Sequence, residues 1–321
     1  MTKIVNALAI IAITLLVLSL PDAARAQTYL TWVSGGGADA NPCTRAQPCQ
    51  TLGHAYGLTA ASGEIDILDG GAFVGAFSIQ KSIKIVNVGA GVASVLSLTV
   101  NTASTDEVVL QGLNFNPYSF GTGDAGVDVT GAGSLIVDHC AFHNYTNAAI
   151  YVTPSAAAKL HVVDTLISNG GGGSFGAVEL APQTGASLMA LLERVQIINS
   201  PGNGIRADSE GFAGAGPVTV QLHDVTVDGS NGGSAIVAVS STSGGAKATI
   251  IADNVTSVNN AGYGFRAVGG TASIVLRRSM IGSNAIGVGV LSGGQVFSYG
   301  DNSFTNNSSG NGVTPTAIPL E

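Results

Sequence analysis

The sequence contains few charged residues, and positive charge is the scarcer kind. Charged side chains make up 10% of its 321 residues, with 12 Lys and Arg against 20 Asp and Glu, so the formal net charge is −8. Proteins that bind nucleic acids or anionic membranes rely on basic patches. The composition therefore excludes nucleic acid as a partner, and it implies repulsion of an acidic polysaccharide unless cations bridge the two.

Long apolar runs are equally scarce. Residues 4–20 form such a run, which follows Lys3 and precedes an A-R-A site at 24–26. A positive start, an apolar run and a small-residue site are the parts of a secretory signal. We predict a signal peptide at 1–26, a mature chain from Gln27, and a secreted protein without a membrane span. The alternative, a membrane anchor, is disfavoured because the run is short.

Cysteine is rare, with residues at positions 43, 49 and 140. Secretion permits a disulfide, and Cys43 and Cys49 share the loop NPCTRAQPC, so we expect them to pair. Cys140 is left over. We interpret it as a small buried apolar residue, and the alternative is a reactive thiol.

Glycine, by contrast, is abundant, with 45 residues, and 45% of the chain is hydrophobic. Disorder requires low hydrophobicity, so we expect a folded chain with many turns.

A repeat begins near Leu135, with steps of 25, 30, 30, 30, 24 and 23 residues. Two columns of residues recur at a constant separation within this variable period, which indicates one rigid segment with loops inserted elsewhere. The first column is His139, Asp164, Arg194, Asp224, Asn254, Arg278 and Asp301, and the second is Asn144, Asn169, Asn199, Gly229, Asn259, Ser283 and Asn306.

Apolar and other residues alternate on both sides of the first column, and a third alternating segment precedes each copy. A period of two is that of a β-strand. Three short strands per repeat, which bury their apolar side only by stacking, indicate an all-β, single-stranded right-handed parallel β-helix. Seven coils are clear, and earlier segments bring the total to about 9–10 over residues 64–307. A flexible tail is expected at 308–321.

The second column predicts tight corners. Asn and Gly tolerate the left-handed backbone conformation that such a corner needs, and stacked Asn side chains can hydrogen-bond along the axis. We therefore interpret this column as structural.

Residues 27–63 are expected to form an N-terminal strand, the disulfide loop and a short helix over 51–62 that caps the first coil. The segments TWVSGGGADANPCTRAQPCQTLGHA and GEIDILDGGAF resemble the start of secreted bacterial β-helix proteins of the pectate-lyase-like superfamily. The resemblance covers residues 31–73, and the coils extend it to about 307. It implies the fold and no single activity, because the superfamily includes lyases, hydrolases, epimerases, adhesins and proteins of unknown activity.

The outward positions of the third strand are the main candidate site. Coils stack ~4.8 Å apart, so the first four residues of this column would form a line about 15 Å long. Tyr151, Arg206 and Arg266 are candidate glycan-binding residues, since Tyr stacks on sugar rings and Arg binds carboxylates through two bonds. The alternative is an ordinary ladder of solvated charges. The column reads Asp128, Tyr151, Glu179, Arg206, Val237, Arg266 and Gly289.

Three residues of this column are candidate catalytic residues: Asp128, Glu179 and Arg206. The Cα atoms of Asp128 and Glu179 should lie ~10 Å apart, so leaning side chains could reach the separation of an inverting glycosidase.

A second ridge follows the first polar column. There Asp138 and Asp164 are candidate oxygen ligands for Ca²⁺, although the interleaved Arg194 opposes a cation. The stretch VDHC at 137–140 is similar to that of some pectate lyases, but the segment R-x-P-x-x-R and the polygalacturonase motifs N-T-D, D-D, G-H-G and R-I-K are missing. We expect no cofactor, with Ca²⁺ implied only if the protein is a lyase.

The missing motifs favour a secreted, non-catalytic β-helix that binds a polysaccharide or cell-surface glycan, or has a structural role at a surface. The alternative is a polysaccharide-active enzyme, a lyase or glycoside hydrolase, acting on a uronate-containing or other extracellular polysaccharide. A cleft walled by loops at 170–175 and 209–217 would favour the enzyme, and a flat face would favour binding.

Overall fold

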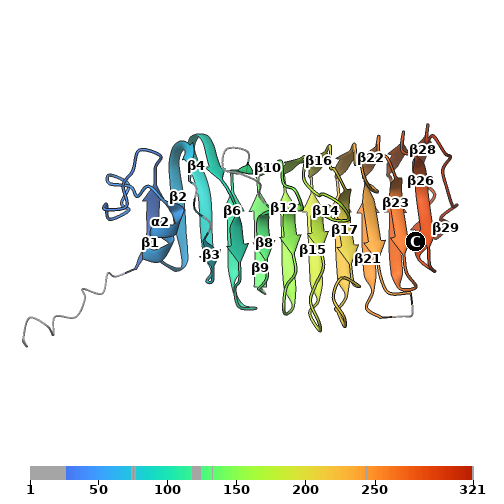
Figure 1. Ribbon diagram of the computed structural model, residues 1–321, viewed down its shortest axis with the longest axis horizontal. Helices are drawn as coiled ribbons and strands as arrows, with labels where there is room; N and C mark the ends of the chain where they lie inside the picture. The colour runs from blue at the N-terminus through green and yellow to red at the C-terminus, as the bar shows by residue number, and fades with distance from the viewer. Residues whose placement is uncertain are drawn as a thin grey trace, which may run out of the picture.

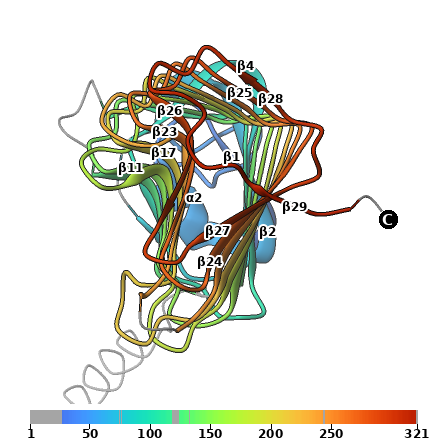
Figure 2. The ribbon, with the colours of Figure 1, turned by 90° about the vertical axis from the view of Figure 1, so that its right-hand side faces the viewer.

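The computed structural model describes residues 27–319, except 74, 76, 118–123, 132 and 243–244. The predicted signal peptide at 1–26 lies outside the described residues. The described chain is a β-solenoid of about 10 parallel coils stacked along one axis (Figure 1). Viewed along that axis, successive coils superpose (Figure 2). The predicted all-β parallel β-helix is thereby confirmed.

Each regular coil contains three strands. In one coil these are β11 (Ala148–Val152), β12 (Ala158–Val163) and β13 (Leu166–Ser168), and each pairs in parallel with its counterparts in the coils before and after. Burial alternates along β12, as the period-two pattern predicts.

Two ladders of strands belong to a single 20-stranded sheet, together with β1 (Thr28–Val33) and β29 (Thr316–Ala317). The long-strand ladder contains β2 (Thr59–Ala72), β4 (Ile83–Val95), β6 (Glu107–Gln111), β9 (Gly133–Asp138), β12, β15 (Leu188–Glu193), β18 (Val218–His223), β21 (Ala248–Asp253), β24 (Ala272–Arg277) and β27 (Gln295–Ser298). The short-strand ladder contains β7 (Leu113–Phe115), β10 (Ala141–His143), β13, β16 (Gln196–Ile198), β19 (Thr226–Asp228), β22 (Thr256–Val258), β25 (Met280–Gly282) and β28 (Ser303–Thr305).

The third strands form a separate nine-stranded sheet. Its members are β3 (Ser78–Ile79), β5 (Leu98–Val100), β8 (Ala125–Val129), β11, β14 (Gly176–Leu180), β17 (Asn203–Asp208), β20 (Ile236–Val239), β23 (Tyr263–Val268) and β26 (Ile286–Leu291). The loop at 170–175 precedes β14 and the loop at 209–217 follows β17, so irregular chain flanks the outward face of this sheet.

The core lies inside the coils, where apolar side chains stack from one rung to the next. Phe115 and Phe142, from neighbouring rungs, have ring centroids 4.5 Å apart and nearly parallel planes. Cys140 is also buried, in agreement with its interpretation as a small apolar residue. Such stacking explains why no coil can bury its apolar side alone.

Both polar columns form corners with left-handed backbone. All seven residues of the second column have positive φ, from 52° at Asn169 to 75° at Gly229. Asn169 Nδ2 donates to Asn144 Oδ1 at 3.0 Å, which confirms the predicted Asn ladder. Six of the seven residues of the first column are left-handed too, with φ of 51° at Arg194 and 48° at Arg278; at the last copy the left-handed residue is Gly300, next to Asp301. The sequence does not predict this, because Arg is not a residue that favours the conformation.

A second ladder of amides lies just inside the corners. Asn260 and Asn284 are both buried, and Asn260 Nδ2 donates to Asn284 Oδ1 at 2.7 Å. Asn260 Oδ1 accepts from the Ser230 N–H at 2.8 Å. The corner thus carries an exposed amide and a buried amide at adjacent positions.

Replacing Asn260 by Ala is expected to lower the free energy of unfolding by about 1–3 kcal/mol, because the buried Ser230 N–H loses its acceptor. Its neighbour provides the matched control. Asn259 is exposed and donates to Asp228 Oδ1, and Asn259→Gly keeps the left-handed backbone, so its expected cost is below about 1 kcal/mol. Denaturant unfolding measures both variants. Equal losses would contradict a role for burial.

The N-terminal segment differs from its prediction in one detail. Helix α2 (Leu52–Leu58) is shorter than the predicted 51–62, because residues 59–62 already belong to β2. Thr51 is its N-cap and accepts from the His54 N–H. Leu52 and Ala55 join the hydrophobic core. That α2 caps the first coil stays a prediction.

The disulfide Cys43–Cys49 is present, with a Cα–Cα distance of 4.6 Å, and confirms the predicted pairing. Among the described residues, no helix is long and apolar enough to cross a membrane.

The segment predicted as a flexible tail, 308–321, contains ordered pairing as far as it is described. Strand β29 pairs in parallel with β27, and Gly312 forms a parallel bridge with Val288 of β26. The Val288 N–H donates to Asn311 O at 2.9 Å, and the Val313 N–H donates to Val288 O at 3.1 Å. This segment therefore lies along the last strand of each of two ladders.

Candidate functional site

The predicted column of outward residues forms on the nine-stranded sheet. Asp128 pairs with Tyr151, Tyr151 with Glu179, and Glu179 with Arg206, each on the next rung. Val237 and Arg266 continue the register. The structure thus brings together the first four candidate residues, and it separates Arg266 from Arg206 by one apolar rung.

A cavity of about 270 Å³ lies at the N-terminal end of this column. Tyr151 of β11 and Phe175 of the loop before β14 form its aromatic part, with ring centroids 5.8 Å apart in an edge-to-face arrangement. The loop at 170–175 therefore supplies a wall, as the sequence suggests. The full lining is Asp124, Ala125, Asp128, Asn147, Tyr151 and Phe175.

Several polar groups in this cavity have no side-chain partner among the described residues. Asp128 Oδ1 is buried without a hydrogen bond, and no described residue bonds the side chain of Asn147 or the hydroxyl of Tyr151. Burial raises the pKa of Asp128 above its ordinary value. Burial raises the pKa of Tyr151 too, helped by the negative charges of Glu179 and Asp128. Unpaired polar atoms next to aromatic rings are the features of a ligand pocket.

Glu179 is not a solvated member of a ladder, because its side chain is only 1% exposed. Oε2 accepts from the Gly176 N–H at 2.7 Å, and Oε1 accepts from Arg206 Nη1 at 2.6 Å. The same Nη1 lies 2.7 Å from Asp208 Oδ2. Asp208 is also buried. The Arg206 guanidinium thus forms ion pairs with two buried carboxylates.

Close backbone approach covers the two carboxylates of this Glu179–Arg206–Asp208 cluster, whereas the Arg206 side chain stays 21% exposed. A Cβ at Gly176 would lie 2.8 Å from the backbone nitrogen of Arg206, and a Cβ at Gly211 would lie 2.9 Å from Asp208 Oδ2. Glycine at 176 lets the chain approach the backbone of Arg206, and glycine at 211 lets it pack against the Asp208 carboxylate. The loop at 209–217 therefore covers part of the cluster.

Burial raises the pKa of Glu179 to about 7, against the opposing effects of Arg206 and the Gly176 N–H. Arg206 cannot neutralise Glu179 and Asp208 together, so a proton on Glu179 relieves the excess negative charge. Because both Glu179 oxygens are bonded and covered, the carboxyl orients Arg206 and does not face a ligand.

Arg266 lies further along the column and contacts Tyr263. Its guanidinium carbon is 5.3 Å from the Tyr263 ring centroid, within the range of a cation–π contact. Its Nε is buried without a hydrogen-bond partner. The Tyr263 ring lies over Gly289, where a Cβ would come within 2.4 Å of the ring.

The candidate Ca²⁺ ligands lie close together but are already bonded. Asp138, His139 and Asp164 bring ligand atoms within 4.8 Å of one another. Both Asp164 oxygens accept from Arg194, at 2.7 and 2.9 Å, and the two Asp138 oxygens contact His139 and Gln111. A guanidinium placed on one of the two carboxylates does not fit a cation site.

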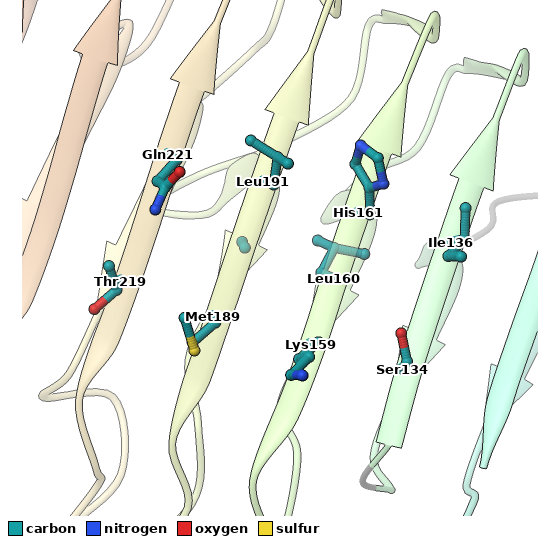
Figure 3. A pocket seen from close by; sticks show the side chains of 10 residues that line it. Ser134, Ile136, Lys159, Leu160, His161, Met189, Leu191, Thr219 and Gln221 are labelled. Atoms are coloured by element: carbon teal, nitrogen blue, oxygen red, sulfur yellow. The ribbon is translucent and has the colours of Figure 1, made fainter. Parts of the chain in front are cut away.

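A second hollow, of about 390 Å³, lies on the outward face of the long-strand ladder (Figure 3). The side chains that line this hollow lie in rows on β9, β12, β15 and β18, with His161 and Leu191 on adjacent strands. Glu193 Oε2 lies 2.8 Å from His161 Nε2. No carboxylate and no Tyr, Phe or Trp lines this hollow, so the cavity on the nine-stranded sheet is the better candidate.

Sequence reasoning missed several residues of the site. Asp208 follows Arg206 by two positions, and that spacing places both on one face of a strand. Phe175 and Asn147 lie beyond the column, outside the strands, where period-two patterns give no direction.

Comparisons with known proteins add little to these observations. No family model matches the sequence, and no curated protein matches it. Among solved structures, a rhamnogalacturonan lyase is similar, with 12% identity over 84% of this chain and 75% of that chain and a TM-score of 0.49. A likeness at this level leaves the function to be inferred from the chain's own residues.

Proposed function

We propose that this protein is a secreted glycan-binding β-helix that holds a sugar ring in the cavity beside Tyr151. The observation that supports this most is the combination of an edge-to-face aromatic pair with a carboxylate oxygen, Asp128 Oδ1, that no described residue bonds. Sugars present apolar ring faces to aromatic side chains and hydroxyl groups to carboxylates and amides. Asp128 and Asn147 supply both kinds of polar group in one cavity.

The size and place of the cavity fit this role. Its volume of about 270 Å³ is slightly below the range of pockets for drug-sized ligands, so it suits one ring of a longer chain. The rest of the chain would follow the outward column toward Arg266. The Cys43–Cys49 disulfide is consistent with the oxidising surroundings that secretion provides.

The alternative is a polysaccharide-active enzyme, and two observations favour it. The cavity has a loop wall at Phe175, and the raised pKa of Asp128 suits a general acid. Glycoside hydrolysis needs a second carboxyl group that reaches the substrate. Glu179, its predicted partner, is buried and bonded at both oxygens. For this reason binding without turnover is the stronger proposal.

Binding is tested by calorimetric titration of the mature chain with neutral, acidic and amine-bearing oligosaccharides. Tyr151→Ala is expected to weaken binding of the tightest ligand about tenfold, because the sugar ring loses its aromatic partner. Tyr299→Ala removes an aromatic side chain far from the cavity and should leave affinity unchanged.

Two results would contradict the proposal. Absence of binding across the panel, or equal effects of Tyr151→Ala and Tyr299→Ala, would remove the cavity as the binding site. New reducing ends or unsaturated uronates that disappear in Asp128→Asn would establish the enzyme instead.

A further inference from the structure

The surroundings of the cavity are negative. Glu179, Asp128 and Asp208 place negative charge near Tyr151, and Arg206 places positive charge there. Near Tyr151 there are thus three carboxylates and one guanidinium, so the net charge stays negative even when Glu179 carries a proton. Asp124 adds a further carboxylate to the lining, and no Lys, Arg or His lines the cavity among the described residues.

The guanidinium of Arg206, the positive charge near the cavity, is already paired with protein carboxylates. Arg206 is held between Glu179 and Asp208, at 2.6 and 2.7 Å. Arg266 lies five rungs from Asp128 in the register, which is about 24 Å. A uronate in the cavity would therefore meet carboxylates and no free cation.

We propose that the cavity selects a sugar ring that bears a free ammonium group, and that it rejects uronic acids. This inference rests on the proposed glycan-binding function and names its ligand class.

The residues of the cavity match such a ligand. An ammonium beside Asp128 would form a charge-assisted hydrogen bond with its carboxylate, whose Oδ1 has no hydrogen-bond partner among the described residues. Tyr151 and Phe175 offer π-electrons to the same cation and apolar contact to the ring. The Asn147 amide is available to a neighbouring hydroxyl.

The net charge of the whole chain favours the same ligand class. The net charge of −8 favours approach of a cationic chain and opposes an anionic one. This general attraction is weak at physiological ionic strength, where the Debye length is about 8 Å. Selectivity must therefore come from the cavity.

The inference is tested with three short oligosaccharides of equal length: a glucosamine oligomer, its N-acetylated counterpart and an oligogalacturonate. Titrations are made at about pH 6, where amines are charged, and at about 0.15 M salt. The amine-bearing oligomer is expected to bind at least about tenfold more tightly than its acetylated counterpart, and the oligogalacturonate most weakly.

Two variants separate the cavity from the overall charge. Asp128→Asn should remove most of the preference for the amine, because it removes the charge and keeps the shape. Glu210→Gln removes an exposed carboxylate that does not line the cavity, so the preference should persist. Tri-lysine carries comparable charge without a sugar ring, and it should bind more weakly than the amine-bearing oligomer.

The outcomes distinguish the two proposals. Equal or tighter binding of the acetylated or uronate oligomer would overturn the selectivity and leave glycan binding in place. An equal loss of preference in Glu210→Gln, or tighter binding of tri-lysine, would also overturn it, because general attraction would then be sufficient. Failure of all three oligosaccharides to bind would overturn both proposals.

Discussion

Replacing Arg206 by Ala is expected to lower the free energy of unfolding by about 3–5 kcal/mol, the usual cost of breaking a buried ion pair from one side. The variant leaves Glu179 and Asp208 buried without their shared cation. Denaturant unfolding measures the loss. A change of this size would exceed what an exposed surface pair contributes, which is below about 1 kcal/mol.

Arg266→Ala is the matched control, since Arg266 occupies the same outward position two rungs away. Its partner is the Tyr263 ring, and no described carboxylate pairs with it, so the expected loss is about 1 kcal/mol or less. A triple replacement, Glu179→Gln with Arg206→Met and Asp208→Asn, should recover most of the stability. Similar losses in the two Ala variants would show that the cluster is worth no more than a surface contact.

Stability is expected to fall as the pH rises from about 4.3, the ordinary pKa of a Glu side chain, through about 7, the pKa to which burial raises Glu179. In this window the folded state holds a proton that the unfolded state has lost, so unfolding becomes more favourable with each step in pH. The stabilisation that comes from the protonated Glu179 side chain is fully present below this pH window and is lost above it. The free energy of unfolding changes by about 3–4 kcal/mol across the window.

Glu179→Gln isolates this effect, because the amide keeps the shape and does not titrate. The measurement is the difference in unfolding free energy between wild type and variant at several pH values across the window. Asp66, whose pKa burial also raises, to about 6, contributes equally to both proteins and cancels. A difference that does not change with pH would place the Glu179 pKa outside this range.

The coils could be predicted from the sequence because their determinants are local. Period-two alternation around His139 and Asp164 gives two strands and a bend, and the constant spacing to Asn144 and Asn169 gives the second corner. These patterns also give the register that places Tyr151 between Asp128 and Glu179. A polar column that repeats in every coil is therefore visible without a structure.

The burial of the site could not be predicted, because loops decide it. Glu179 reads as an outward, solvated residue, and it is buried since chain at Gly176 and Gly211 packs closely against its cluster. Phe175 reaches the cavity from an insertion without periodicity, and Asn147 precedes a strand. Neither belongs to a column, so only the three-dimensional arrangement shows that they face Tyr151.

The pairing of residues 310–317 has a consequence for assembly. A solenoid offers the open hydrogen-bonding edges of its terminal coil as a template on which another copy could stack end to end. Here Gly312 occupies part of the edge of β26, and β29 occupies part of the edge of β27. A second molecule would have to displace both contacts before it could add a coil. These contacts therefore oppose the end-to-end stacking of copies into a filament.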